Sequence, residues 1–123
     1  MVKGITLNLK DTITNFVLEN FSEEGTELEA VTPEDWKETP AFITNINDDN
    51  FKNLAIKMNN AWKNLTRKIG PTKEHIESFS SLIYMEHPFV VPSTGRFREL
   101  YYWDSYWTVK GLLLSEMQQT TWV

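Results

Sequence analysis

Apolar residues recur at steps of three and four between residues 51 and 69 of this 123-residue chain, while lysines, asparagines and an arginine fill many of the positions between them. This period places the apolar side chains along one face of a helix. The glycine and proline at positions 70 and 71 form a stop signal. We therefore expect a helix from residue 47 or 48 to about residue 69, whose apolar face packs in a core or, alternatively, lines a groove for a partner.

The N-terminal part of the chain carries a shorter apolar stripe of the same period. It predicts a helix over about residues 9–20, and Gly25 breaks the pattern afterwards. The run from Thr32 to Asp35, a hydroxyl residue followed by a proline and two acids, is typical of a helix start. Because Pro40 follows a few residues later, we expect only a short helix there, which holds the adjoining tryptophan against a larger body.

The helical period fails between Pro71 and Gly95, where short extended-looking runs lie beside prolines. We expect an irregular connection over about residues 70–103, and then a final helix from residue 104 or 105 to residue 117 or 118. Apolar and aromatic side chains cover most of its circumference, which is typical of a helix buried on nearly all sides. Gly111 in its middle costs about 1 kcal/mol relative to alanine, so a close neighbouring helix is expected there. The fold class predicted from these elements is all-α.

Charge and composition exclude several classes of function. The formal net charge is −5 and the 12 basic residues are scattered, which argues against nucleic acid or an anionic membrane surface as a partner. The chain has no cysteine, and His75 and His87 lack the companions of a triad or metal site, so no metal or other cofactor is expected. No segment reads as a signal peptide or a membrane span, which leaves the compartment undetermined.

Two triplets, beginning at Asn20 and at Asn64, fit the N-x-S/T pattern of N-glycosylation. Such triplets are also frequent by chance, so each asparagine is either a modification site or an ordinary surface residue. The sequence alone leaves both interpretations open.

The segment from Val91 to Trp107 is the most informative part of the chain. It places two arginines, two carboxylates and six aromatic rings behind a turn rich in proline and glycine. Aromatic faces together with charged hydrogen-bonding groups are the mixture from which sugar sites are built. The segment therefore indicates carbohydrate binding.

This segment also resembles the first signature of the trehalases, Pro-Gly-Gly-Arg-Phe-x-Glu-x-Tyr-x-Trp-Asp-x-Tyr. The matching residues are Gly95, Arg96, Phe97, Glu99, Tyr101, Trp103, Asp104 and Tyr106. The turn departs from the signature, because Pro92-Ser93-Thr94-Gly95 is one residue longer and one glycine poorer than the family's Pro-Gly-Gly. Residues 32–46, 60–68 and 103–117 look similar to animal trehalases, those of invertebrates in particular, whereas residues 118–123 depart from the family pattern.

The resemblance implies a glycosidase that hydrolyses α,α-trehalose to two glucose molecules with inversion, on an (α/α)6 toroid and without a metal. A chain of 123 residues is too short for that toroid. Residues 1–123 would then be the incomplete N-terminal portion of a single domain, ending soon after the signature. The resemblance further implies that the catalytic acid and base lie outside this chain, and that the enzyme is secreted or anchored to a membrane.

By resemblance, Arg96, Trp103 and Asp104 hold the sugar, with Phe97 and Tyr101 as further candidates. A guanidinium can bridge adjacent hydroxyls, a carboxylate accepts two of them, and an indole face packs on the C–H side of a pyranose. Each polar residue has a structural alternative. Arg96 could pair with Glu99 or Asp104, and Asp104 could cap the last helix.

A function of another class fits the same residues. A non-catalytic helical protein derived from the trehalase fold could act on a partner through exposed apolar surface. The spacing of Glu99 and Glu116 does not support an acid and base pair, because nothing in the sequence brings the two carboxylates together.

Overall fold

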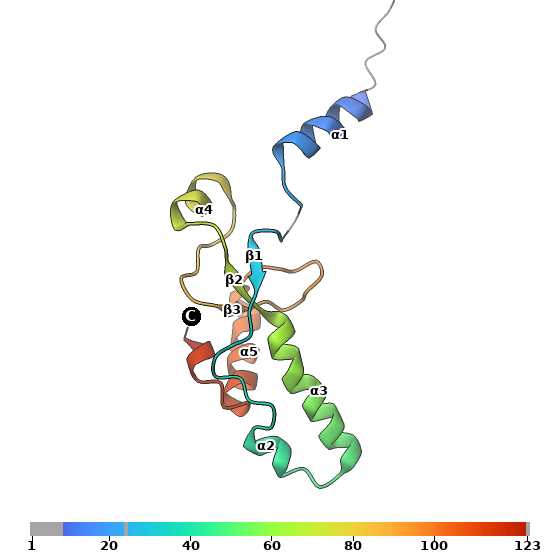
Figure 1. Ribbon diagram of the computed structural model, residues 1–123, viewed down its shortest axis with the longest axis vertical. Helices are drawn as coiled ribbons and strands as arrows, with labels where there is room; N and C mark the ends of the chain where they lie inside the picture. The colour runs from blue at the N-terminus through green and yellow to red at the C-terminus, as the bar shows by residue number, and fades with distance from the viewer. Residues whose placement is uncertain (1–8, 24, 123) are drawn as a thin grey trace, which may run out of the picture.

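The computed structural model describes residues 9–23 and 25–122. Over these residues the chain forms five α-helices, three short strands and a final 3-10 turn (Figure 1). The helices are α1 (Leu9–Asn20), α2 (Ala41–Thr44), α3 (Asp49–Leu65), α4 (Lys73–Phe79) and α5 (Tyr102–Leu114); the strands are β1 (Leu28–Ala30), β2 (Thr66–Ile69) and β3 (Phe89–Val90); the 3-10 turn is η1 (Gln119–Thr121).

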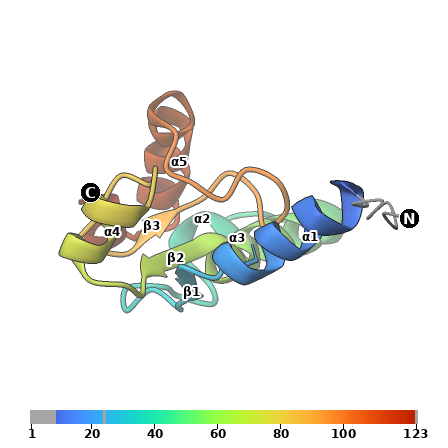
Figure 2. The same cartoon turned by 90° about the horizontal axis from the view of Figure 1, so that it is seen from above.

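The three strands form one antiparallel sheet in the order β1-β2-β3. Figure 2 shows the strands in this order, with α5 beyond β3 on the side away from β1. Leu28 lies opposite Ile69, and Thr66 lies opposite Val90. The described part of the fold is therefore mostly helical, as the all-α prediction expects, with a small sheet that this prediction did not include.

Helix α3 confirms the strongest periodic signal but ends four residues before the predicted position. The carboxylate of Asp48 caps its start by accepting from the N–H groups of Asn50 and Phe51, at 2.9 and 3.0 Å. At the other end, the hydroxyl of Thr66 donates to the carbonyl of Trp62, and the chain becomes extended because β1 and β3 pair on either side of it. The buried residues Thr66 and Ile69 lie three positions apart, which also fits the stripe of a helix. Strand pairing on both sides makes this run extended instead.

Two other predictions of local structure are wrong. The segment after Thr32 forms only a turn, closed by the N–H of Trp36 donating to the carbonyl of Pro33, and the next helix, α2, begins after Pro40. Conversely, the connection predicted to be irregular contains α4 and β3. Helix α4 is capped by Thr72, whose hydroxyl accepts from the N–H of His75, and its inward side chain, Ile76, is fully buried.

The sheet separates two small cores. Alternate residues of an extended strand point to opposite faces, so Phe89 and Val91 join a cluster with Ile69, Ile76 and Leu82. Val90 points the other way and packs with Leu112 and Met117, against the partly buried rings of Trp36 and Trp62. The second core attaches α5 to α3 and to the segment after β1.

Two helices leave most of their apolar side chains exposed. Helix α1 has the predicted bounds, yet none of its residues is buried, and Figure 1 shows it projecting from the end of the molecule opposite α2. Helix α5, predicted to be buried on nearly all sides, has one buried residue, Leu112. Four aromatic side chains near its start are each more than half exposed, namely Tyr102, Trp103, Tyr106 and Trp107.

None of the helices in residues 9–23 and 25–122 combines the length and the apolar character needed to cross a membrane.

Candidate functional site

The trehalase-like signature occupies the irregular segment before α5 and the first two turns of that helix. The segment is anchored at its start, where Val91 is fully buried and its N–H donates to the carbonyl of Leu65 at 3.0 Å. The turn that is longer than the family pattern closes on itself. The N–H of Gly95 donates to the hydroxyl of Ser93, and the guanidinium of Arg98 donates to the carbonyls of Thr94 and Gly95, at 3.1 and 2.5 Å.

The five predicted sugar-binding residues lie at or near the surface. Arg96 and Phe97 are exposed, and Asp104 is half-buried in the first turn of α5. The rings of Phe97 and Tyr101 are brought together edge to face, with centroids 6.1 Å apart, so these two side chains form one aromatic unit. Trp103 is 75% exposed, which leaves its indole face open to a ligand.

The structural alternatives for Arg96 and Asp104 are not observed. Among the described residues, no ion pair joins Arg96 to Glu99 or Asp104. Helix α5 begins at Tyr102 with Tyr101 as its N-cap, so Asp104 is not the capping residue. Its carboxylate still lies in the first turn, where the helix dipole favours a negative charge. The charged groups of Arg96 and Asp104 are therefore not held by each other.

A second feature of α5 was missed by the sequence analysis. Lys110 lies over the rings of Tyr106 and Trp107, with its Nζ 4.9 and 5.6 Å from their centroids. A shallow pocket of about 360 Å³ is lined by Tyr102, Ser105, Tyr106, Val109 and Lys110. The spacing of 102, 106 and 110 along a helix could have revealed this face.

The C-terminal half of α5 is packed tightly, in contrast to its start. A side chain at Gly111 would begin 2.7 Å from the ring of Trp62, which confirms the predicted close approach of a neighbouring helix, α3. The indole N–H of Trp62 donates to the buried hydroxyl of Ser115 at 2.9 Å. Leu112 and Met117 are fully buried beside it.

Two residues after the end of α5, Glu116 occupies the left-handed region with φ of +62°. The N–H of Met117 donates to the carbonyl of Leu112 and that of Glu116 to Leu113, at 2.9 and 3.1 Å. This is the hydrogen-bond pattern in which glycine usually takes the left-handed position. A glutamate at this position carries backbone strain, and contacts made by its side chain must offset the cost of that strain.

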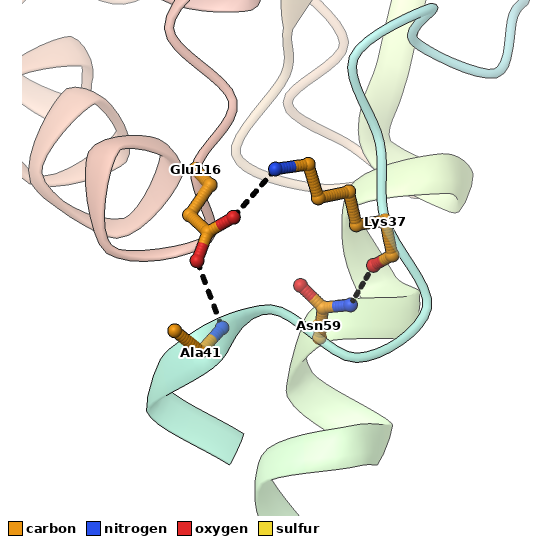
Figure 3. Close-up of polar contacts among 4 residues, drawn as sticks. All are labelled: Lys37, Ala41, Asn59 and Glu116. Atoms are coloured by element: carbon orange, nitrogen blue, oxygen red, sulfur yellow. Dashed lines mark hydrogen bonds and ion pairs between the residues drawn. The ribbon is translucent and has the colours of Figure 1, made fainter. Parts of the chain in front are cut away.

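The carboxylate of Glu116 makes two such contacts (Figure 3). It accepts from Lys37 Nζ at 2.5 Å and from the N–H of Ala41 at 2.9 Å. The hydrogen bond from Lys37 and then that from the Ala41 N–H lower the pKa of this carboxyl below its ordinary value. Glu116 therefore has a contact role that the sequence analysis did not assign.

Asn59 of α3 holds the same segment from the other side. Its side-chain amide donates to the carbonyl of Lys37 at 2.7 Å, and its backbone carbonyl accepts from the indole N–H of Trp36 at 3.1 Å. Its Oδ1 is buried without a hydrogen-bond partner. We call Lys37, Ala41, Asn59 and Glu116 the polar clamp.

A larger pocket lies away from the signature. It has a volume of about 860 Å³, between the segment after β1 and η1, and it shares no lining residue with the five predicted sugar-binding residues. On its wall, Asp35 accepts from both the N–H and the hydroxyl of Thr120. No group of three or more His, Cys, Asp or Glu residues in the described part of the chain could hold a metal ion.

Comparison with known proteins decides the family. A family model described as Trehalase matches residues 5–122. The chain belongs to the trehalase family. It is 50% identical to the trehalase of Apis mellifera over 108 residues, which are 88% of this chain and 17% of that protein. It is 48% identical to the trehalases of Oryctolagus cuniculus and Homo sapiens, in each case over 90% of this chain and 19% of the relative.

The same matches show how much of a trehalase sequence this chain covers. The chain spans less than a fifth of the length of these relatives. The family match continues to residue 122, so the prediction that the residues after Met117 leave the family pattern is wrong. The match also includes the signature and its longer turn. Residues 5–122 thus form one portion of a trehalase sequence.

Proposed function

We propose that this chain is the N-terminal part of an α,α-trehalase, which hydrolyses trehalose to two glucose molecules with inversion. The observation that carries the proposal is the surface formed by the signature. Its guanidinium, carboxylate and aromatic groups lie at the surface, on a helix whose other end is firmly packed. Family membership supplies the substrate class, and trehalose is the proposed partner.

In this proposal each residue holds the sugar in its own way. The exposed guanidinium of Arg96 bridges two hydroxyls, and the carboxylate of Asp104 accepts from two more. The open indole face of Trp103 packs on the apolar side of a glucose ring, beside the aromatic unit of Phe97 and Tyr101. No step of this binding requires a metal ion or another cofactor.

The reacting carboxylates are proposed to lie outside residues 1–123. An inverting glycosidase places its acid and base about 6.5–9.5 Å apart, so that a water molecule fits on the face opposite the leaving sugar. Glu116 does not suit either role, because Lys37 and the Ala41 N–H occupy its two oxygens. The chain thus contributes part of the substrate pocket of a single domain with an (α/α)6 fold.

We also propose that the enzyme is secreted or membrane-anchored and that Asn20 or Asn64 carries a glycan. Both side chains are exposed, Asn20 at the end of α1 and Asn64 in the last turn of α3. Production behind a secretion leader, with Asn20→Gln and Asn64→Gln variants, tests this by the loss of a glycosidase-sensitive mass. An unmodified wild-type chain would contradict the modification.

The enzymatic proposal is tested by a hybrid in which residues 1–122 replace the matching segment of the Apis mellifera trehalase. We expect the folded hybrid to release glucose from trehalose and the Asp104→Ala hybrid to lose most of that activity. Glu77→Gln is the matched control, because Glu77 forms only an exposed ion pair with Lys73 on α4. A folded, inactive hybrid, or an Asp104→Ala hybrid with full activity, would contradict the proposal.

A second function is favoured by the exposed apolar side chains of α1 and α3. Phe16, Leu18, Leu54 and Met58 are each more than half exposed, which fits a non-catalytic helical protein that acts through this surface. Size-exclusion chromatography and thermal unfolding of the chain separate the two functions. A monodisperse monomer with a sharp transition favours the interaction protein, whereas association or dye binding to apolar surface favours a portion of an enzyme.

A further inference from the structure

The two halves of α5 are held very differently. Its contacts with the core lie at Gly111 and Leu112, and just beyond its end at Ser115 and Met117. Its first two turns carry Trp103 and Tyr106, which are 75% and 58% exposed. The direction of the helix is therefore set at its C-terminal end, whereas the predicted sugar-binding groups lie near its start.

This arrangement makes the direction of α5 sensitive to its anchor. Asp104 lies twelve residues before Glu116, a distance of about 18 Å along a helix that rises about 1.5 Å per residue. A tilt of about 5° at the anchor then moves Asp104 by about 1.5 Å. Misplacement of a binding group by about 1 Å can cost roughly a hundredfold in rate. The contacts that prevent such a tilt are part of the binding machinery.

The polar clamp supplies contacts of this kind. The two oxygens of Glu116 reach Lys37 and Ala41, which precede it by 79 and 75 residues, so they tie the end of α5 to the segment that begins α2. Asn59 fixes that segment to α3 through the carbonyl of Lys37. The end of α5 and the segment that leads into α2 thus meet at one carboxylate, and α3 holds that segment through Asn59 (Figure 3).

The backbone at Glu116 gives independent support. Glycine is the usual residue at this position, since a side chain is strained there. A glutamate that keeps the left-handed conformation and directs both oxygens to other elements is explained by the contacts of its side chain. A helix end that needed only to stop would be served better by glycine.

We infer that Glu116 is a positioning residue for the sugar site, which fixes the direction of α5 through Lys37 and Ala41 and thereby places Trp103 and Asp104. The inference rests on the proposed function. Glu116 itself does not touch the substrate in this arrangement.

The ionised form of Glu116 makes these contacts. Lys37 is the charged group that contacts it, and Asn59 on the facing helix is neutral. Because the pKa of Glu116 is lowered in the folded chain, its contribution to stability is complete above the ordinary value of 4.5 and is lost as the pH falls through the lowered pKa. The position of α5 is therefore expected to loosen only in acid.

The first test uses the 123-residue chain, which has no native cysteine. Spin labels at Tyr102→Cys on α5 and Asn53→Cys on α3, both exposed positions, report the direction of α5 by pulsed electron resonance. We expect Glu116→Ala and Glu116→Gly to shift or broaden the distance distribution by about 1.5 Å or more, and Glu77→Gln to leave it unchanged. Identical distributions in all variants would overturn the inference, whatever the activity of the hybrid.

The second test measures kcat and KM for trehalose in the hybrid. We expect Glu116→Ala and Glu116→Gly to lower kcat/KM by about tenfold to a hundredfold. Glu116→Gln should lose less, because its amide oxygen can still accept from the Ala41 N–H, and it carries the test if the alanine variant fails to fold. The glycine variant removes the strained side chain, so full activity with raised stability in that variant would overturn the inference. An inactive wild-type hybrid would instead contradict the proposed function, and the labelled chain would then decide the inference.

Discussion

The two ends of α5 are buried to very different extents. At its C-terminal end, Leu112 is 1% exposed, Met117 is fully buried, and a tryptophan ring lies against Gly111. At its N-terminal end, Tyr102 is 94% exposed and Trp103 is 75% exposed. The chain therefore packs the C-terminal end of the helix that carries the signature, but it leaves the aromatic side chains of the signature exposed. A sugar site needs walls that exclude water, and the remaining portion of a trehalase is where we expect them.

Helices α1 and α3 repeat the same contrast. Both carry an apolar stripe of helical period, but α3 has the buried residues Ala55 and Asn59, whereas α1 has none. The stripe of α3 is itself covered only in part, since Phe51 and Met58 stay exposed. An apolar stripe indicates that a helix packs against another apolar surface, and the fold decides whether this chain supplies that surface.

The largest expected effect concerns activity. If this chain holds the sugar-binding groups but lacks the catalytic acid and base, the isolated chain should hydrolyse trehalose at least about 10⁴-fold more slowly than the hybrid. The reason is that an acid and a base each contribute a factor of about 10² to 10⁴ to the rate. Glucose release by both proteins at equal concentration provides the comparison. Turnover by the purified chain that Asp104→Ala abolishes would show that the catalytic groups lie within residues 1–123.

Truncating a side chain should cost much stability in the core beneath α5 and little on the exposed helix α1. Leu112→Ala is expected to lower the free energy of unfolding by about 2–5 kcal/mol, because it leaves a cavity in the core beneath α5. Leu18→Ala on α1 removes the same atoms from an exposed site and should change it by less than about 0.5 kcal/mol. Urea unfolding measures both. A large loss in Leu18→Ala would mean that α1 packs in solution.

Within the uncovered region, Arg96→Lys should cost more than its unchanged charge suggests. A lysine cannot reproduce the planar fork that addresses two hydroxyls, and losing a charged hydrogen bond is worth about 1.5–3 kcal/mol, or one to two decades in kcat/KM. Steady-state hydrolysis by the hybrid compares this variant with Trp107→Phe. Equal, small losses in both would mean that the longer turn before Arg96 holds it outside the sugar site.

A smaller loss of stability than that of Leu112→Ala is expected where α5 approaches α3. In Gly111→Ala the new methyl group would lie 2.7 Å from the ring of Trp62, which Ser115 holds in place. Overpacking costs about 1–3 kcal/mol, and the helical preference of alanine returns about 1 kcal/mol, so we expect a net loss of up to about 2 kcal/mol by thermal unfolding. Gly95→Ala, with its nearest contact at 3.4 Å, is the control. A stabilised Gly111→Ala chain would show that the two helices separate.

Local pattern was enough for the elements that depend on near neighbours in the sequence. The bounds of α1 and the start of α3 follow from side chains three and four positions apart, and Gly111 correctly indicated a close helix. The signature was recognisable for the same reason, because its spacing is contained in one short segment. The cap of α4 at Thr72 is also local, and the prolines around that short helix concealed it.

The tertiary structure decided everything that joins distant segments. The residues after Leu65 became a strand because β1, far before them in the sequence, and β3, after them, pair with them on either side. The turn at Trp36 is held by Asn59, and the left-handed end of α5 is held by Lys37 and Ala41, contacts that no local period encodes. Periodicity indicates which face of an element is apolar, whereas strand pairing, burial and ion pairs depend on which other element packs beside it. For that physical reason the sequence alone predicted the three long helices α1, α3 and α5 and the candidate sugar-binding groups, whereas the fold determined how firmly each is held.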